Sequence, residues 1–358
     1  MDRFAAVLKR DFIYILLLAL IVGVFVSYHI SDNSSDSDDT GQVVAEQQLD
    51  QQSLLEEKMR SGHINKSLSV FLLVMFAGAF LGILFLVIVL IKGFPKRKYY
   101  ARSANSEDDV GGKAVLDHEP AAPWTLWDVA KILIIFFTAY LAFSTLQGIA
   151  TAVKKIPHED INVQFAMILN MLFAEIVALF FLFRLIRINY DTSLDVFGLY
   201  PRNFMYHVMV GCMSYCMFLP FFFAVNYSTY KIAEVLGIEL EPQQIFYLIA
   251  DESNFTGHQY RVLILFIAFI GPVCEEIFFR GFLYRSLKKY IGVFGGLLIS
   301  AVLFSLIHNN MMAFFPILGL GIMLGILVEK TGSLLPSIVM HIIVNSVSLA
   351  LFFALTKQ

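Results

Sequence analysis

Residues 264–283, ILFIAFIGPVCEEIFFRGFL, place two glutamates and an arginine inside a run that is otherwise apolar. The run is long enough to cross a bilayer as a helix, since a span needs about 20 apolar residues. A charged side chain at that depth costs about 2.5–3.5 kcal/mol on insertion scales, and charges found there usually serve a function. The stretch therefore predicts a membrane helix and the neighbourhood of a functional site.

The composition of the whole chain is that of a membrane protein. Of its 358 residues, 58% are hydrophobic and 15% are charged, against about 45–50% and about 25% in soluble domains. The composition also excludes a nucleic-acid-binding protein, because no basic surface remains that would neutralise many phosphates. Cys212, Cys216 and Cys274 lie inside apolar runs, so no disulfide framework is expected.

Counting apolar runs of span length predicts eight or nine transmembrane helices, and hence an all-α, polytopic helix bundle. The candidate runs are 12–30, 68–91, 129–150, 161–183, 205–225, 261–287, 292–308, 313–329 and 334–356.

The distribution of charge divides the chain into three parts. Residues 1–92 are predicted to form an N-terminal transmembrane hairpin around an acidic outer loop, 31–66. Residues 93–123 are expected to be a cytoplasmic flexible linker, and residues 124–358 a helical core. The lysines and arginines that follow the second apolar run place its end, and therefore the N-terminus, in the cytoplasm. We expect an integral, multi-pass protein of a cell membrane, most simply the inner membrane of a bacterium.

Two pairs of residues in the core need an interpretation of their own. Trp124 and Trp127 precede the first core span and are expected at the membrane–water interface, where amphipathic aromatic residues gather. Asn170 and Glu175 lie inside the run 161–183. We interpret them as helix-packing contacts or as groups facing the site cavity, in preference to catalytic residues.

The glutamates of the opening stretch have different expected partners. Glu276 and Arg280 are four residues apart, so they share a helix face and are expected to pair. Glu275 points about 100° away and is left without a partner, toward a neighbouring helix. Pro272 removes a backbone donor and loosens the helix about one turn before the acids. A desolvated carboxylate without a partner suits a general base or acid.

Two later helices carry polar residues at the same spacing. Phe304 and His308 share one face, and His341 and Asn345 share another. Three helices thus each present a polar stripe, and we expect these stripes to meet in one cavity. The candidate catalytic residues are Glu275, Glu276, Arg280, His308, His341 and Asn345.

The depth of these groups sets a condition on the fold. By helical rise, Glu275 lies about 15 Å above Arg285, whereas His308 lies about 27 Å above Tyr290. The two meet only if the short helices near residues 309 and 310 tilt and turn inside the membrane. Irregular backbone is tolerated there only where it lines protein or water.

In this order, Glu-Glu-x-x-x-Arg, Phe-x-x-x-His and His-x-x-x-Asn resemble the motifs of the CPBP intramembrane proteases, the CAAX-protease and bacteriocin-processing (ABI) family. The resemblance covers residues 264–346, and all three motifs are complete. It implies an intramembrane endopeptidase acting on a membrane-anchored, prenylated or exported peptide. It also implies that Glu276 and Arg280 hold the shape of the site.

The resemblance further implies a mechanism. Glu275 and His308 would activate the attacking water, and His341 and Asn345 would stabilise the oxyanion of the tetrahedral intermediate. Members of the family are described both as metal-dependent and as glutamate-dependent. Glu275, His308 and His341 would be the ligands of a divalent metal such as zinc. The chain has no H-E-x-x-H motif, and we favour a mechanism that requires no cofactor.

Two other functions are compatible with buried acid–base groups. One is a transporter or proton-relay protein, although no pair of broken helices recurs in two halves of the chain, as inverted repeats would require. The other is a non-catalytic membrane scaffold or immunity protein of the same fold, against which the complete motifs argue. The expected partners are membrane lipid and a peptide or prenylated protein. The sequence gives no oligomeric state.

Overall fold

The computed structural model describes most of the chain from residue 122 onward and a few segments before it. The described residues are 11–22, 77, 78, 80, 99–102, 113–116, 122–154, 163–192, 194–199, 204–238, 243, 245, 246, 249 and 255–356. The predicted acidic loop, 31–66, and most of the predicted second span, 68–91, lie outside them.

Six helical stretches of the described residues are long and apolar enough to cross a membrane. They are Leu126–Ala150, Phe165–Tyr190, Phe204–Leu236, Gly257–Leu306, Met311–Thr331 and Leu335–Ala354. Large apolar side chains such as Phe137, Phe180 and Phe221 are exposed on their outer faces. Soluble proteins rarely expose so much contiguous apolar surface, whereas lipid covers it without cost. The chain is therefore an integral, multi-pass membrane protein with a helical bundle.

The six stretches differ from the eight or nine predicted spans in identifiable ways. Within the first apolar run, 12–30, the described residues form a shorter apolar helix, Asp11–Val22, and residues 23–30 lie outside the described part of the chain. The predicted spans 261–287 and 292–308 join into one helical stretch of 50 residues. This stretch bends at Gly292, whose φ of 73° and ψ of −179° are not helical. Glycine adopts such backbone angles without a steric penalty.

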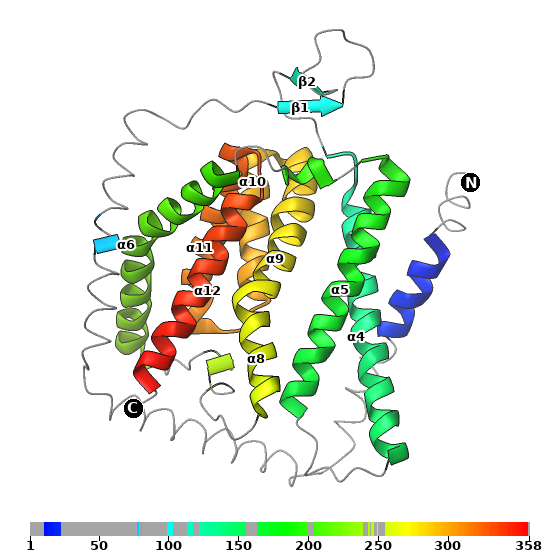
Figure 1. Cartoon of the computed structure of the whole chain (residues 1–358), viewed down its shortest axis with the longest axis horizontal. Helices are drawn as coiled ribbons and strands as arrows, with labels where there is room; N and C mark the ends of the chain where they lie inside the picture. Colours follow the sequence, from blue (N-terminus) through cyan, green and yellow to red (C-terminus); the bar gives the residue numbers. More distant parts are fainter. Residues whose placement is uncertain are drawn as a thin grey trace.

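The helical elements follow one another along the chain (Figure 1). They are α4 (Leu126–Lys154), α5 (Val163–Tyr190), η2 (Leu194–Phe197), α6 (Phe204–Leu236), α8 (Gly257–Leu265), η4 (Phe266–Ile270), α9 (Gly271–Glu276), η5 (Ile277–Leu283), α10 (Tyr284–Leu306), α11 (Met311–Thr331) and α12 (Leu335–Thr356).

A small β-hairpin interrupts the helical pattern before the core. Strand β1 (Tyr99–Arg102) pairs antiparallel with β2 (Lys113–Leu116), and Tyr99 lies opposite Leu116. The prediction of a flexible linker over residues 93–123 does not include these strands. Their tyrosine and valine residues favour extended backbone.

The segment α9–η5 lies inside the bundle and is held by helices from distant parts of the chain. Helix α9 contacts both α12 and α5, and η5 contacts α4, α10 and α11. An aromatic core that includes Phe197, Phe282 and Phe304 packs beside it. The acidic motif is thus held inside the bundle by helices that precede it and helices that follow it in the sequence.

Trp124 belongs to this core, which corrects the predicted interfacial position. Its side chain is fully buried, its indole N–H donates to the Phe282 carbonyl over 3.0 Å, and its ring packs against Phe197 and Phe282. Trp127, by contrast, remains partly exposed. A buried indole needs a hydrogen-bond acceptor, and the backbone of η5 supplies one.

Wide π-helical turns flank the acidic motif on both sides. Segment η4 precedes α9 and η5 follows it, and Pro272 occupies the first turn of α9. Side chains of other helices bond to backbone carbonyls in these turns: Asn345 donates to Ile267 and Ser300 donates to Phe279. Pro272 lacks an N–H, and such bulges are frequent at functional sites. The predicted loosening of the helix before the acids is confirmed.

Candidate active site

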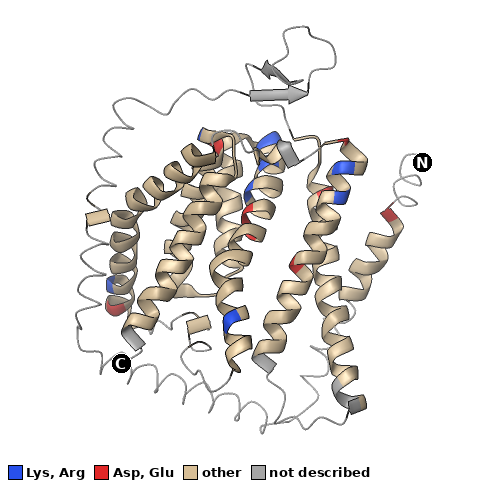
Figure 2. Ribbon diagram, viewed as in Figure 1, with Lys and Arg blue, Asp and Glu red and all other residues tan. Residues whose placement is uncertain are grey.

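Charged side chains lie mostly toward the helix ends, but acids also occur well inside the bundle, on α5 and α9 (Figure 2). The group on α9 contains the predicted ion pair. Arg280 Nη1 lies 2.7 Å from Glu276 Oε1, and both side chains are at most 1% exposed. Breaking such a pair would leave a buried charge without a partner, so its two members hold each other in place.

Arg280 also ties α9–η5 to two later helices. Its Nη2 donates to the carbonyl of Gly321 on α11 over 3.3 Å, and its guanidinium carbon lies 4.1 Å from the ring centroid of Phe304 on α10. A Cβ at Gly321 would lie 3.0 Å from the Cβ of Ala301 and 3.3 Å from Arg280 Nη2. Glycine at this position therefore permits the close approach of α11 to α10 and to Arg280. The sequence predicted the pairing with Glu276 but not these two further contacts.

His341 reaches from α12 to both glutamates. Its Nδ1 lies 3.2 Å from Glu276 Oε1, and its Nε2 lies 3.7 Å from Glu275 Oε2. The first distance is that of a hydrogen bond and the second is longer than one. Because Glu276 accepts the hydrogen bond, Nδ1 carries the proton and Nε2 is turned toward Glu275.

Glu275 differs from its neighbour in exposure and in bonding. Its side chain is 21% exposed, whereas that of Glu276 is fully buried. The described residues give its carboxylate the near contact with His341 and no hydrogen bond. The prediction that Glu275 faces a neighbouring helix without a direct partner agrees with this geometry. Its oxygens keep their acceptor capacity for a ligand.

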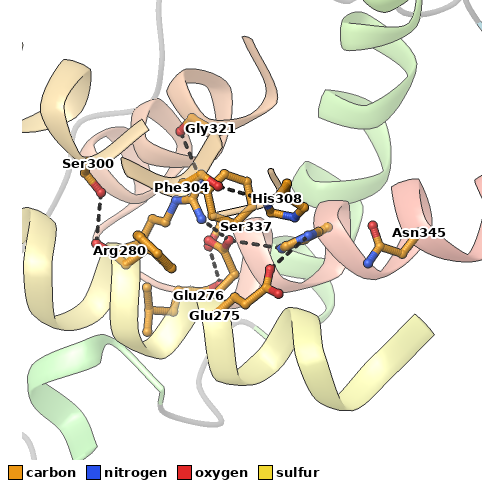
Figure 3. A network of polar contacts seen from close by, with 12 residues as sticks. Glu275, Glu276, Arg280, Ser300, Phe304, His308, Gly321, Ser337 and Asn345 are labelled. Atoms are coloured by element: carbon orange, nitrogen blue, oxygen red, sulfur yellow. Dashed lines mark hydrogen bonds and ion pairs between the residues drawn. The ribbon is translucent and has the colours of Figure 1, made fainter. Parts of the chain in front are cut away.

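His308 lies beyond the last turn of α10 and joins the group through Phe304. Its Nδ1 donates to the Phe304 carbonyl over 2.7 Å, which leaves Nε2 as an acceptor in the neutral ring. The Phe304 ring meets both imidazoles at a steep angle, with centroids 5.0 Å from that of His308 and 5.6 Å from that of His341. In Figure 3, the His308 ring and the Glu275 carboxylate both lie on the side of Glu276 that is away from Arg280.

The predicted condition on depth concerns the turn that carries His308. Asn309 adopts a positive φ of 45°, and the Asn310 side chain caps the next helix by accepting from the Ala313 N–H over 2.8 Å. In Figure 1 the turn between α10 and α11 lies at about mid-height of the bundle, not at its end. The predicted reversal of the chain inside the membrane is compatible with this position.

Asn345 lies one turn beyond His341 on α12, at the edge of the group (Figure 3). Its amide nitrogen donates to the Ile267 carbonyl in η4 over 2.9 Å. Of the six predicted residues, Glu275, Glu276, Arg280 and His341 are thus in direct contact, whereas His308 and Asn345 are held beside them through Phe304 and η4. One N–H of the Asn345 amide is already engaged, and one is left for a ligand.

Glu175, interpreted from the sequence as a packing contact or a group facing the site cavity, lies on a helix that packs against α9. It is 9% exposed, and its Oε2 is buried without a hydrogen-bond partner among the described residues. Its carboxyl lies beside the Cys274 thiol and within electrostatic range of Glu275. The adjacency of Cys274 and Glu275 on α9 is visible in the sequence, but the rotation of α5 that brings Glu175 to them is not.

Glu275, His308 and His341 are the residues that would hold a metal ion at this site. Within the described part of the chain, no three His, Cys, Asp or Glu side chains are grouped closely enough to hold a metal ion. The alternative ligand set Glu275, His308 and His341 therefore does not form such a cluster in this structure.

Comparison with known proteins confirms the resemblance. Residues 257–347 match the family described as type II CAAX prenyl endopeptidase, Rce1-like. The matched range runs from α8 into α12 and includes all six predicted site residues. No curated protein and no solved structure matches the chain significantly. Residues 257–347 are therefore similar to an Rce1-like, CPBP-family domain.

Proposed function

We propose that the protein is an intramembrane endopeptidase that hydrolyses a peptide bond of a membrane-associated substrate, either a CAAX-type prenylated protein or an exported peptide. The family match over residues 257–347 supports a protease. One observation carries the proposal: Glu275 is partly exposed and makes no hydrogen bond with a described residue, yet it lies 3.7 Å from His341 inside an apolar bundle. Such a carboxylate is free to accept a proton from a water.

In the proposed first step, the water oxygen attacks the carbonyl carbon of the scissile bond while Glu275 takes one proton from the water. His308 orients the same water, because its Nδ1 bond to Phe304 leaves the Nε2 lone pair free. The C–N bond then breaks as the proton on Glu275 passes to the leaving amine. Proton transfer by a positioned side chain typically contributes about 10²–10⁴-fold to a rate.

The negative charge that develops on the carbonyl oxygen requires donors. His341 supplies one when Nε2 carries a proton, since Nδ1 is already committed to Glu276. The free N–H of Asn345 supplies a second from the next turn of α12. Donors that are fixed before the reaction stabilise the oxyanion without reorganisation, and this is usually the largest contribution to catalysis.

Glu276 and Arg280 act through His341 and through the backbone, not on the substrate. Both are buried beyond the reach of a ligand, and Glu276 fixes the orientation of the imidazole. Gly321 and Phe304 hold Arg280 from the other side. We therefore assign this pair a positioning role.

The test is the substitution Glu275→Gln, compared with Glu234→Gln as the matched control. Glu234 pairs with Lys231 on the exposed surface of α6. Mass spectrometry of membrane peptides from cells making each form should show peptides that require the wild type and the control but are missing with Glu275→Gln. The loss in rate is expected to be at least about 100-fold, with expression and thermal stability unchanged.

The same experiment separates the other functions. Proton-coupled uptake in vesicles without peptide products would support a transporter and contradict the proposal. Binding of a partner that survives Glu275→Gln and His308→Ala, again without products, would support a scaffold and also contradict it.

A further inference from the structure

The side chain of Phe304 on α10 contacts three of the predicted site residues, and the mechanism above uses it only to hold Arg280. The ring is fully buried. The guanidinium carbon of Arg280 lies over it, 4.1 Å from its centroid. The centroids of the His308 and His341 imidazoles lie 5.0 Å and 5.6 Å from the same point. Figure 3 shows the ring between Arg280 and His308.

These neighbours distinguish Phe304 from an ordinary core phenylalanine. Phe282 is equally buried in the same aromatic core, but its ring packs against the Trp124 indole. An aromatic ring carries partial negative charge on its face and partial positive charge at its edge. A guanidinium over the face is therefore attracted to it, and the attraction is strongest where water is excluded.

The contacts of Phe304 complete a closed cycle of four side chains. Arg280 Nη1 lies 2.7 Å from Glu276 Oε1, and the same oxygen lies 3.2 Å from His341 Nδ1. The Phe304 ring then packs against His341 on one side and against Arg280 on another. Because η5, α9, α12 and α10 each contribute one member, the cycle fixes these segments relative to one another at the site.

The ring also limits how the two imidazoles can turn. The hydrogen bond from Nδ1 fixes one atom of the His341 ring, but not its rotation about that bond. Phe304 packs against this imidazole at an interplanar angle of 81°, which opposes the rotation and keeps Nε2 turned toward Glu275. Phe304 holds His308 twice, because its ring packs against the imidazole and its carbonyl accepts from Nδ1 over 2.7 Å.

We propose that Phe304 is a positioning residue whose ring, held on its face by Arg280, sets the spacing and orientation of the two imidazoles. The inference rests on the proposed function, in which His308 orients the water and His341 stabilises the oxyanion. A misplacement of about 1 Å at a reacting group can lower a rate about 10²-fold. An aliphatic side chain would fill the same space but would offer no π face to the guanidinium.

Fluorinated phenylalanines incorporated at position 304 test this, because fluorine withdraws electron density from the ring face and changes the size of the ring little. With one, two and three fluorines, kcat for a peptide substrate should fall stepwise, to about a tenth with three. KM should not change, since the buried ring does not reach the substrate. The Tm of the protein in detergent micelles should fall in the same order.

The matched control is the same series at Phe282, which should leave kcat and Tm unchanged because this ring packs against an indole and not against a guanidinium. Phe304→Leu, which has no π face, should lower kcat at least as far as the trifluorinated ring does. In an Arg280→Met background, fluorination at position 304 should no longer lower the Tm.

The outcomes separate a positioning role from a purely structural one. A Tm that falls with fluorination while kcat stays constant would show that the ring only stabilises the fold, and would overturn the inference. A Tm that falls equally with and without Arg280 would overturn it too, because the guanidinium would not be using the ring face. If the wild type cleaves no peptide at all, the proposed function is refuted. Constant kcat and Tm across the series in an active protein would refute this inference alone.

Discussion

The protein buries charge in two regions, and the two are bonded to different degrees. Near the start of α4, Lys131 lies 3.0 Å from Asp11 and 3.5 Å from Asp128. Trp127 donates to Asp11 over 3.0 Å, and Tyr190 donates to Asp128 over 2.5 Å. We call this group the α4 network. It joins the N-terminal helix Asp11–Val22 to the core and gives each carboxylate at least two partners.

The group around α9 is less completely bonded. Glu276 Oε1 accepts from Arg280 and His341, but Glu276 Oε2 is buried without a partner among the described residues. Glu275 makes no hydrogen bond there, and Glu175 Oε2 has none either. A buried polar network with all its hydrogen bonds made gives a rigid and unique structure, whereas buried polar groups without partners lower the stability of the fold.

The contrast teaches how to separate structural from reactive charge in a membrane protein. Burial alone does not distinguish the two regions, since Asp11, Lys131, Glu276 and Arg280 are all nearly inaccessible. The distinguishing property is acceptor capacity that no described residue uses. That capacity is found on α9 and on the neighbouring α5, and at the partly exposed Glu275 it is available to a water.

The largest effect on stability is expected from Arg280→Met. The substitution leaves the Glu276 carboxylate buried without its cation and removes the contacts with Gly321 and Phe304. Breaking a buried pair by removing one partner costs about 3–5 kcal/mol. The free energy of unfolding in a denaturant titration in detergent micelles should fall by that amount, and cleavage should be lost.

Glu276→Gln with Arg280→Met provides the control for this prediction. With both charges removed, much of the lost stability should return, because the penalty comes from the unpaired charge. If the double variant is as unstable as the single one, the packing of the guanidinium, and not its charge, determines the effect.

A smaller effect is expected from Lys131→Met in the α4 network. Hydrogen bonds to charged groups contribute about 1.5–3 kcal/mol each, and the short Asp11–Val22 helix can move away from α4 so that the two carboxylates become hydrated. Stability should fall by about 1–3 kcal/mol, while cleavage by the folded protein stays near wild type. Loss of proteolysis at full stability would show that the two regions are coupled. The α4 network would then not be purely structural.

Much of the site could be predicted from sequence because it depends on spacing along one helix. The pair Glu276 and Arg280 follows from four-residue spacing, and the 2.7 Å distance between Arg280 Nη1 and Glu276 Oε1 confirms it. The same spacing places Phe304 one turn from His308, and their rings pack together as expected. Such relations are local, so they do not require knowledge of how the helices pack.

Other features depend on packing between helices and left no local signal. The segment FIAFI that forms η4 contains nothing that predicts a π-helical turn or the bond from Asn345 to Ile267. Helix α5 has apolar residues on all sides, so its sequence does not show which face meets α9, and it leaves Glu175 as either a packing contact or a group facing the site cavity. Trp124 was expected at an interface because the acceptor that allows its burial, the Phe282 carbonyl, lies 158 residues away.

The smallest effect is expected from metal removal, and it tests whether the open acceptors on α9 are completed by water or by an ion. We propose that no metal is required, because Glu275, His308 and His341 do not form a group of metal ligands in the described part of the chain. Incubation with a chelator should leave kcat/KM for a peptide substrate unchanged, whereas Glu275→Gln abolishes it under the same conditions. Loss of cleavage on chelation, restored by added zinc and not by magnesium, would show that Glu275 and the Nε2 atoms move together to bind an ion. The open acceptors on α9 would then be metal ligands. The group around α9 would differ from the α4 network because its metal ion is absent, and not because its carboxylates are reactive.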